Sequence, residues 1–279
     1  MVRFLKRSYI YLIFAFLYMP IVVLMVYSFN NSRSRGVWGG FTLHWYGELF
    51  RDRTIMSSLY STLIIGVSAA LIATIIGTLA AIGIHNSRGW QKKLIMNVTY
   101  LPVLSPEIVT AISLMILFVF ARVRFGYLTL LLAHITFNIP YVILSVLPKL
   151  RQLNKHLYEA ALDLGCTPGQ ALWKVIIPEI MPGIVTGMLL AFTLSIDDFV
   201  VSFFTTGSGV STLSITIYSM ARRGINPKIN ALSTIMFMFV LVLLIIVNVR
   251  QAREQKKERN GKHGHKKQVS PYRTEFGDA

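Results

Sequence analysis

The chain has 279 residues, of which 54% are hydrophobic and only 14% are charged, whereas soluble globular domains carry about 25% charged residues. This composition leaves too little polar sequence to cover a water-soluble core, which excludes the ordinary soluble enzymes and binding domains. The formal net charge of +16 does not indicate nucleic-acid binding, because no aromatic-interleaved basic face or recognition fold lies between the apolar segments.

Apolar segments long enough to cross a bilayer recur along the chain. A helix needs about 20 residues to cross ~30 Å of hydrocarbon, because every backbone polar group must be satisfied within the segment. Six segments meet this requirement: Tyr9 to Phe29, Ser57 to Ile84, Leu94 to Ala121, Phe125 to Pro148, Ile180 to Phe204 and Ile229 to Val249. We therefore predict an all-α integral membrane protein with six transmembrane helices. The first segment is too long for a usual secretory signal and lacks a small-residue cleavage site.

The distribution of Lys and Arg predicts the orientation of the spans. If both termini are cytoplasmic, 19 of the 28 basic residues lie inside, as the positive-inside tendency requires. Most of this excess comes from residues 250–279, a basic segment that cannot bury a core and is expected to be disordered at the anionic inner leaflet. We therefore predict a transmembrane domain over residues 1–249 and a cytoplasmic tail over 250–279.

The largest polar insertion, residues 150–179, predicts a hairpin of two short helices. The segment His156 to Leu164 has apolar residues at helical spacing, and Gly165 then supplies a helix stop. Thr167 and Gln170 have the spacing of a capping box, with Pro168 at the first helical position. We expect this second helix to end at Pro178, because proline disfavours helical geometry in the residue before it.

The hairpin also carries a specific pattern: Glu159-Ala160-Ala161, then Gly165, then Ile177-Pro178, between the fourth and fifth of six spans. In this pattern and its position the chain resembles the permease subunits of bacterial ABC importers with the type I permease fold. The resemblance implies that the hairpin docks on a separate ATPase and transmits its motion to the spans. The implied coupling residues are Glu159, Ala160, Ala161, Gly165 and Pro178.

The resemblance further implies a location in the bacterial inner membrane and three partners. These are a second permease subunit, a cytoplasmic ATPase dimer and an extracytoplasmic binding protein that delivers the substrate. The chain has no Walker A loop, nucleotide fingerprint or His-rich metal spacing, so we expect a non-catalytic subunit whose ATPase partner binds ATP and Mg²⁺. Its single cysteine, Cys166, excludes an intrachain disulfide and the usual cysteine metal sites.

Three acidic residues inside the spans are the strongest candidates for substrate recognition. Each charge at a helix centre costs about 2.5 to 3.5 kcal/mol, so Glu107, Asp197 and Asp198 need a partner, water or a cation. Pro102 and Pro106 should kink or break the span before Glu107. Asp197 and Asp198 lie about 100° apart on a helix and cannot both point in one direction, so we expect one of them to cap a helix, to bond a neighbouring helix or to be protonated. The alternative is that Arg122, Arg124 or basic residues of a partner subunit pair with these acids in a purely structural role.

Further motifs resemble the spermidine and putrescine permeases of the same family over roughly residues 10–249. They are Leu17-Tyr18-Met19-Pro20-Ile21, Ser28-Phe29-Asn30, Trp45-Tyr46, His134-Ile135-Thr136-Phe137 and Thr193-Leu194-Ser195-Ile196-Asp197-Asp198. This resemblance implies a polyamine path that includes Trp45, Glu107, Ser195, Asp197 and Asp198. These permeases typically carry aspartate where this chain has Glu107, so the preferred polyamine stays open.

Other functions remain as alternatives at this stage. A permease of the same family for another cargo, such as iron, would share the hairpin, and a passive cation channel would share the acidic residues. An intramembrane aspartyl protease is disfavoured, because such enzymes place one acid on each of two helices. His134 and Asn138 are four residues apart in the fourth predicted span, where such residues usually form interhelical hydrogen bonds.

Overall fold

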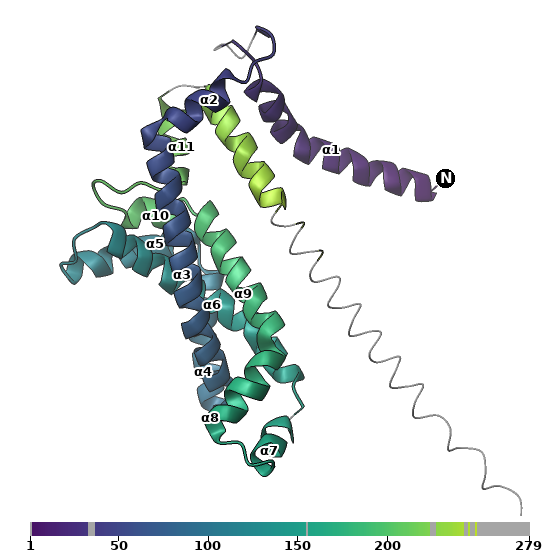
Figure 1. The fold of residues 1–279 in the computed structure, drawn as a ribbon, viewed down its shortest axis with the longest axis vertical. Helices are drawn as coiled ribbons and strands as arrows, with labels where there is room; N and C mark the ends of the chain where they lie inside the picture. Colours follow the sequence, from purple (N-terminus) through teal and green to yellow (C-terminus); the bar gives the residue numbers. More distant parts are fainter. Residues whose placement is uncertain are drawn as a thin grey trace, which may run out of the picture. The chain divides into compact units, whose positions relative to one another are not determined.

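The computed structural model describes residues 2–32, 37–154, 156–223, 227–242, 245 and 249, with residues 2–7 described by their backbone alone. Figure 1 shows the order of the helices. The chain divides into two compact units, residues 1–49 with 226–279 and residues 50–225, which are described one at a time.

The first unit contains α1 (Val2–Ser28), α2 (His44–Arg51) and a later helix over Pro227–Val242. The 21 residues Ser8–Ser28 of α1 are long and apolar enough to span a membrane, and Pro227–Val242 is a shorter apolar helix. The end of the sixth predicted span and the tail at residues 250–279 lie almost entirely outside the described residues. The domain boundary at Val249 therefore stays a prediction.

The second unit contains the remaining predicted spans. They are α3 (Arg53–Asn86), α4 (Gly89–Leu104) with α5 (Glu107–Phe120), α6 (Tyr127–Gln152), and α9 (Ile177–Asp197), the last preceded by α8 (Pro168–Ala171) and a π-helical turn, η1 (Leu172–Ile176). The short helices α7 (His156–Asp163), α10 (Val200–Thr205) and α11 (Leu213–Arg222) complete the unit. In the part of the chain that the structure describes, four helices are long and apolar enough to span a membrane, the bent pair α4–α5 supplies a fifth span, and the sixth predicted span is found as the shorter apolar helix Pro227–Val242.

The third predicted span is broken, as its two prolines indicated. The axes of α4 and α5 differ by 106°, and the break falls at Ser105 and Pro106. Pro106 has no backbone N–H to continue the ladder of α4, and Ser105 before it adopts an extended conformation with ψ of 146°. Glu107 therefore becomes the first residue of a new helix.

Three long helices, α3, α6 and α9, pack against one another and form the core of the second unit (Figure 1). Their contacts are made by small residues that bring the backbones close together. A Cβ placed on Gly77 of α3 would lie 2.7 Å from Val142 Cβ of α6, and one on Gly187 of α9 would lie 3.3 Å from Val142 Cα. Small residues are the usual means by which membrane helices pack, because lipid offers no hydrophobic drive for association.

Two predicted helix ends are wrong. The fifth span was expected to run to Phe204, but α9 ends at Asp197, because Asp198 adopts an extended backbone with ψ of 126°, and the separate helix α10 begins at Val200. The second hairpin helix was expected to end at Pro178, but it continues through η1 into α9 as one 30-residue helix, Pro168–Asp197. The π-helical turn ends just before Ile177, so Pro178 falls in the first turn of α9, where proline is tolerated.

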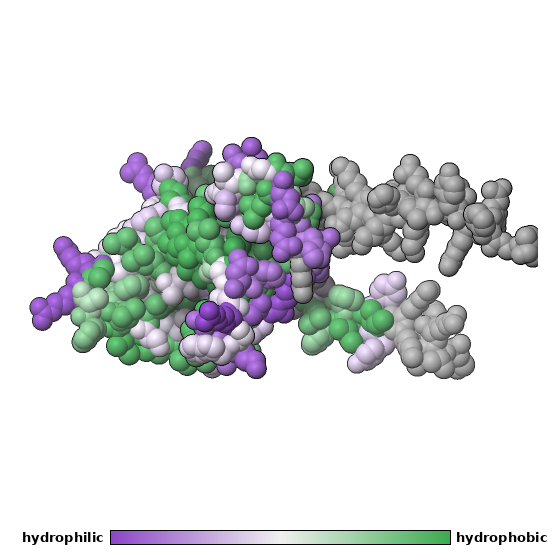
Figure 2. All heavy atoms as spheres, turned by 90° about the horizontal axis from the view of Figure 1, so that it is seen from below, coloured by the Kyte–Doolittle hydropathy of each residue, from purple (hydrophilic) through white to green (hydrophobic). Residues whose placement is uncertain are grey.

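Large apolar side chains cover much of the exterior. Figure 2 shows extensive apolar areas on the visible face, with hydrophilic residues gathered in separate patches. On α3, for example, Tyr60, Ile75 and Leu79 are all more than half exposed. Such a surface requires lipid or partner subunits to cover it, so the chain is a multi-pass membrane protein.

Candidate functional site

The acidic residues of the spans converge in the second unit, at the points where two helices break. Glu107 is the first residue of α5, and Asp197 is the last residue of α9. The negative charges of Asp198 and Asp197 act on Glu107, and that of Glu107 acts in turn on Tyr141 of α6. The structure therefore brings together three of the five predicted path residues and adds an aromatic residue.

Glu107 and Asp197 both have exposed side chains. The ion pairs of the described residues include neither of them, and neither Arg122 nor Arg124 takes part in one. The alternative that arginines of this chain neutralise the acids thus has no support within the described residues. Because the charge of Asp197 acts on Glu107, these two accessible carboxylates repel, and a cation that approaches both relieves the repulsion.

Asp198 differs from Asp197 in burial and in hydrogen bonding. Its side chain is fully buried, and its two carboxylate oxygens accept hydrogen bonds from backbone N–H groups of α10, at 3.1 Å from Val201 and 2.7 Å from Ser202. The Oδ2 atom also lies 3.6 Å from His134 Nε2, which shares a 3.0 Å hydrogen bond with Ser202 Oγ. Asp198 therefore caps the first turn of α10.

Ser195 is buried one turn before Asp198, and its hydroxyl accepts a 2.7 Å hydrogen bond from Asn138 Nδ2. The predicted interhelical role of His134 and Asn138 is confirmed, since both join α6 to the α9–α10 segment. Ser195 thus helps to hold α9 against α6, and its hydroxyl points into the core instead of toward Glu107 and Asp197.

Trp45 belongs to the first unit, on α2, whereas the other four predicted path residues belong to the second unit. It is 5% exposed, and its indole N–H donates a 2.7 Å hydrogen bond to the carbonyl of Asn30. The side chain of Asn30 in turn accepts from Gly39 N and donates to Val37 O. Within this unit Trp45 therefore stabilises the loop that follows α1.

Two residues of the acidic region were missed in the sequence. Ser202 follows Asp198 by four residues, and an aspartate before the apolar run Val200 to Phe204 is a helix-start pattern that indicated a cap there. Tyr141 had no such signal, because a tyrosine in an apolar span is usually only a packing residue. Its proximity to Glu107 depends on the break between α4 and α5.

The predicted hairpin is confirmed in its local geometry. Gly165 has φ of +84° and follows α7, and the bonds from Gly165 N to Leu162 O and from Cys166 N to Ala161 O form a Schellman motif. The capping box is present, with Thr167 and Gln170 bonding each other's backbone N–H. The elbow is therefore a defined turn with a fixed direction.

The predicted coupling residues lie on or next to this hairpin. Glu159 and Ala160 are exposed, and Glu159 pairs with His156 at 3.2 Å, whereas Ala161 is buried against the remainder of the unit. Pro178 is exposed in the first turn of α9. Leu164 and Trp173 are 87% and 68% exposed, so the hairpin presents apolar side chains outward as well as inward.

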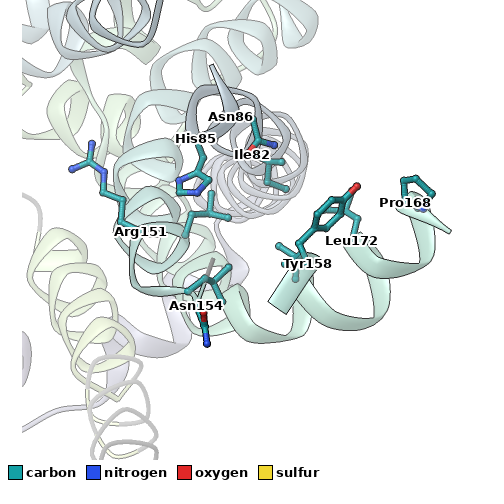
Figure 3. Close-up of a pocket in the computed structure, with 12 residues that line it drawn as sticks. Ile82, His85, Asn86, Arg151, Asn154, Tyr158, Pro168 and Leu172 are labelled. Carbon is teal, nitrogen blue, oxygen red and sulfur yellow. The ribbon is translucent and has the colours of Figure 1, made fainter. Parts of the chain in front are cut away.

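A pocket of about 650 Å³ lies between this hairpin and the ends of α3 and α6 (Figure 3). Figure 3 shows His85 and Asn154 on one side and Tyr158, Leu172 and Pro168 on the other. Its lining places the end of α3, the end of α6 and the hairpin at the same end of the unit. The turn between the second and third predicted spans therefore lies on the same side of the membrane as the hairpin, which is the turn between the fourth and fifth.

Known proteins with the same fold are transport subunits. In a bacterial ABC transporter involved in the import of the acidic polysaccharide alginate, one chain matches with a TM-score of 0.69 at 17% identity, covering 90% of this chain and 95% of that chain. A chain of the MetNI methionine ABC transporter matches with a TM-score of 0.55 at 18% identity, covering 79% and 99%. The fold is that of a membrane permease of ABC importers.

The sequence comparisons define the family. The model of the binding-protein-dependent transport system inner membrane component matches residues 73–259, and the chain belongs to this family. The spermidine/putrescine transport system permease protein PotC of Haemophilus influenzae is 38% identical over 238 residues, covering 85% of this chain and 93% of that protein. The putrescine transport system permease protein PotI of Escherichia coli K12 is 40% identical over 235 residues, covering 80% and 82%.

Proposed function

We propose that this chain is one of two permease subunits of an ATP-driven importer for polyamines. A cytoplasmic ATPase dimer would bind ATP and Mg²⁺ and hydrolyse the nucleotide, and an extracytoplasmic binding protein would deliver the substrate. Support comes from the family, from the substrates that the names of the relatives PotC and PotI state, and from the acidic region of the second unit.

The observation that carries the substrate class is the pair of exposed, unpaired carboxylates. In the described part of the chain, neither Glu107 nor Asp197 takes part in an ion pair, and the aromatic Tyr141 lies within range of the Glu107 charge. Carboxylates replace the water around an ammonium group, and an aromatic face adds cation–π attraction. An oligoamine carries several ammonium groups on a flexible chain and so matches acids placed along a path.

Trp45, Ser195 and Asp198 are proposed to shape this path through the groups they hold. The first orders the loop after α1, and the other two fix α9 and α10. The hairpin is proposed to face the cytoplasm, because Arg88, Lys92 and Arg151 lie at the ends of the helices that meet it. Both termini would then be cytoplasmic.

The proposal is tested by uptake of labelled spermidine into proteoliposomes that contain the full complex. We expect uptake to require ATP and to be competed by putrescine, and we expect Glu107→Gln and Asp197→Asn each to lower the rate about tenfold or more, since each loses a charge-assisted contact. Glu179→Gln, an exposed acid at the opposite end of α9, serves as the control. Uptake without ATP would identify a passive channel, and full activity of both variants would remove the acids from the path.

A further inference from the structure

We propose that Asp198 is a positioning residue that holds α10 in place and thereby sets the direction of the Asp197 carboxylate, and that it does not itself contact the transported cation. This inference rests on the proposed function. It assigns different roles to two adjacent residues of the same type: Asp197 contacts the cation, and Asp198 positions Asp197.

The hydrogen bonds of Asp198 leave it little capacity for a substrate. A substrate ligand must offer an oxygen to the path, yet the side chain of Asp198 is fully buried and each of its oxygens already accepts a backbone N–H. The shorter bond, 2.7 Å to Ser202 N, is of the length expected for a charge-assisted hydrogen bond. Exposing Asp198 would leave the N–H groups at the start of α10 without partners, at the cost of a lost helix cap.

Contacts at both ends fix α10 to α6. At its start, His134 of α6 lies 3.0 Å from Ser202 Oγ and 3.6 Å from Asp198 Oδ2. At its end, Thr129 Oγ1 donates a 2.9 Å hydrogen bond to the Thr205 carbonyl. Just beyond, the backbone of Gly207 lies against the carbonyl of Phe125 and leaves no room for a Cβ. These contacts hold α10 in a fixed position between α6 and the end of α9.

The fixed position of α10 determines the direction of the Asp197 side chain. Asp197 is the last residue of α9, and Asp198 leaves the helix with φ of −62° and ψ of 126°. Because the extended backbone at Asp198 turns the chain, the cap directs one carboxylate into the core and leaves the preceding one exposed, where its charge acts on Glu107. Loss of the cap should therefore disturb Asp197 while leaving its charge in place.

The test exploits the fact that serine and asparagine cap helices without carrying a charge. Asp198→Ser, Asp198→Asn and Asp198→Ala are compared in the reconstituted full complex, with Asp197→Ser and Asp197→Asn as matched variants. Initial rates of spermidine uptake are measured against spermidine concentration at equal amounts of assembled transporter. This normalisation separates the KM for polyamine from the simple loss of folded protein.

We expect Asp198→Ser and Asp198→Asn to stay within about threefold of the wild-type rate and Asp198→Ala to raise the KM about fivefold or more, because only alanine removes the cap. Both Asp197 variants should lose uptake whichever polar residue is introduced. If all three Asp198 variants are equally impaired, the charge itself is needed and the inference is overturned; wild-type behaviour of Asp198→Ala overturns it too.

Two further outcomes are also decisive. If Asp198→Ala fails to assemble, rescue of both assembly and KM by Asp198→Ser supports the positioning role, and failure of that rescue contradicts it. If the Asp197 variants transport normally, the proposed cation path is wrong, and that result is recognised independently of how the Asp198 variants behave.

Discussion

At the scale of single residues, the surrounding backbone decides what a charged side chain does. Asp197 and Asp198 are chemically identical neighbours, but the first ends a helix and is exposed, whereas the second caps the next helix and is buried. The sequence predicted that the two would point apart, since adjacent helical residues differ by about 100°. It did not predict which one caps, because that depends on where α9 ends.

A second acid whose behaviour depends on its neighbour is Glu48, on α2 outside the spans. A hydrogen bond from Lys228 lowers the pKa of Glu48 below its ordinary value of 4.5. A carboxyl whose pKa is lower in the folded state stabilises the fold above its unfolded-state pKa, and this contribution is lost as the pH falls through the folded-state pKa. We expect the stability of wild-type protein to decrease in this acid range more than that of Glu48→Gln.

The measurement is the unfolding midpoint of the purified protein as a function of pH. Asp163→Asn, an exposed acid at the end of α7 for which the structure shows no ion pair among the described residues, is the control and should follow the wild-type curve. Identical pH dependence for wild type and Glu48→Gln would show that the Lys228 contact contributes nothing in solution.

At the scale of elements, prolines and glycines mark where helices break, but their effect depends on position. Pro106 breaks the third span, as predicted, and creates the helix start that carries Glu107. Pro178 does not end the second hairpin helix, because a π-helical turn precedes it and places it in the first turn of α9. A π-helical turn has no clear signature in a single sequence, so this end was predicted wrongly.

The elbow of the hairpin supplies a prediction about coupling. Gly165 has φ of +84°, a conformation that costs a residue with a Cβ about 1 to 2 kcal/mol. We expect Gly165→Val to redirect the hairpin and to lower the number of spermidine molecules imported per ATP hydrolysed. The readout is the ratio of uptake to phosphate release in proteoliposomes.

Gly169→Ala is the matched control for this variant. Gly169 also lies in the hairpin with open space at its Cβ position, but it has no positive φ. Its ratio of uptake to hydrolysis should equal that of the wild type. A normal ratio for Gly165→Val would mean that the Schellman turn is not required for coupling.

At the scale of the whole molecule, packing between helices must stabilise each compact unit, because lipid supplies no hydrophobic driving force for helix association. In the second unit, the close packing of α3, α6 and α9 depends on glycine and alanine at the contacts. The sequence predicted the spans and the hairpin because apolar length and capping residues are local signals. It could not predict the helix contacts or the proximity of Tyr141 to Glu107, which arise from packing between distant segments.

A pair of glycines in α3 tests this packing. Gly77→Ala would place a Cβ 2.7 Å from Val142 Cβ, whereas Gly83→Ala meets nothing within 4 Å. We expect Gly77→Ala to destabilise the protein by about 1 to 3 kcal/mol through overpacking and Gly83→Ala to stabilise it by about 0.5 to 1 kcal/mol. Thermal unfolding of the purified protein in detergent distinguishes them, and equal midpoints would refute close contact between α3 and α6 at Gly77.

The unbroken helix from Pro168 to Asp197 has a mechanical consequence. Its 30 residues span about 45 Å, with the elbow at one end and an exposed carboxylate at the other. Such a helix moves as one unit. A partner that tilts the elbow therefore also displaces Asp197, because no flexible segment between them absorbs the movement. Movement of the ATPase partner at the elbow and release of a cation bound at Asp197 would then belong to the same rigid-body motion of this helix.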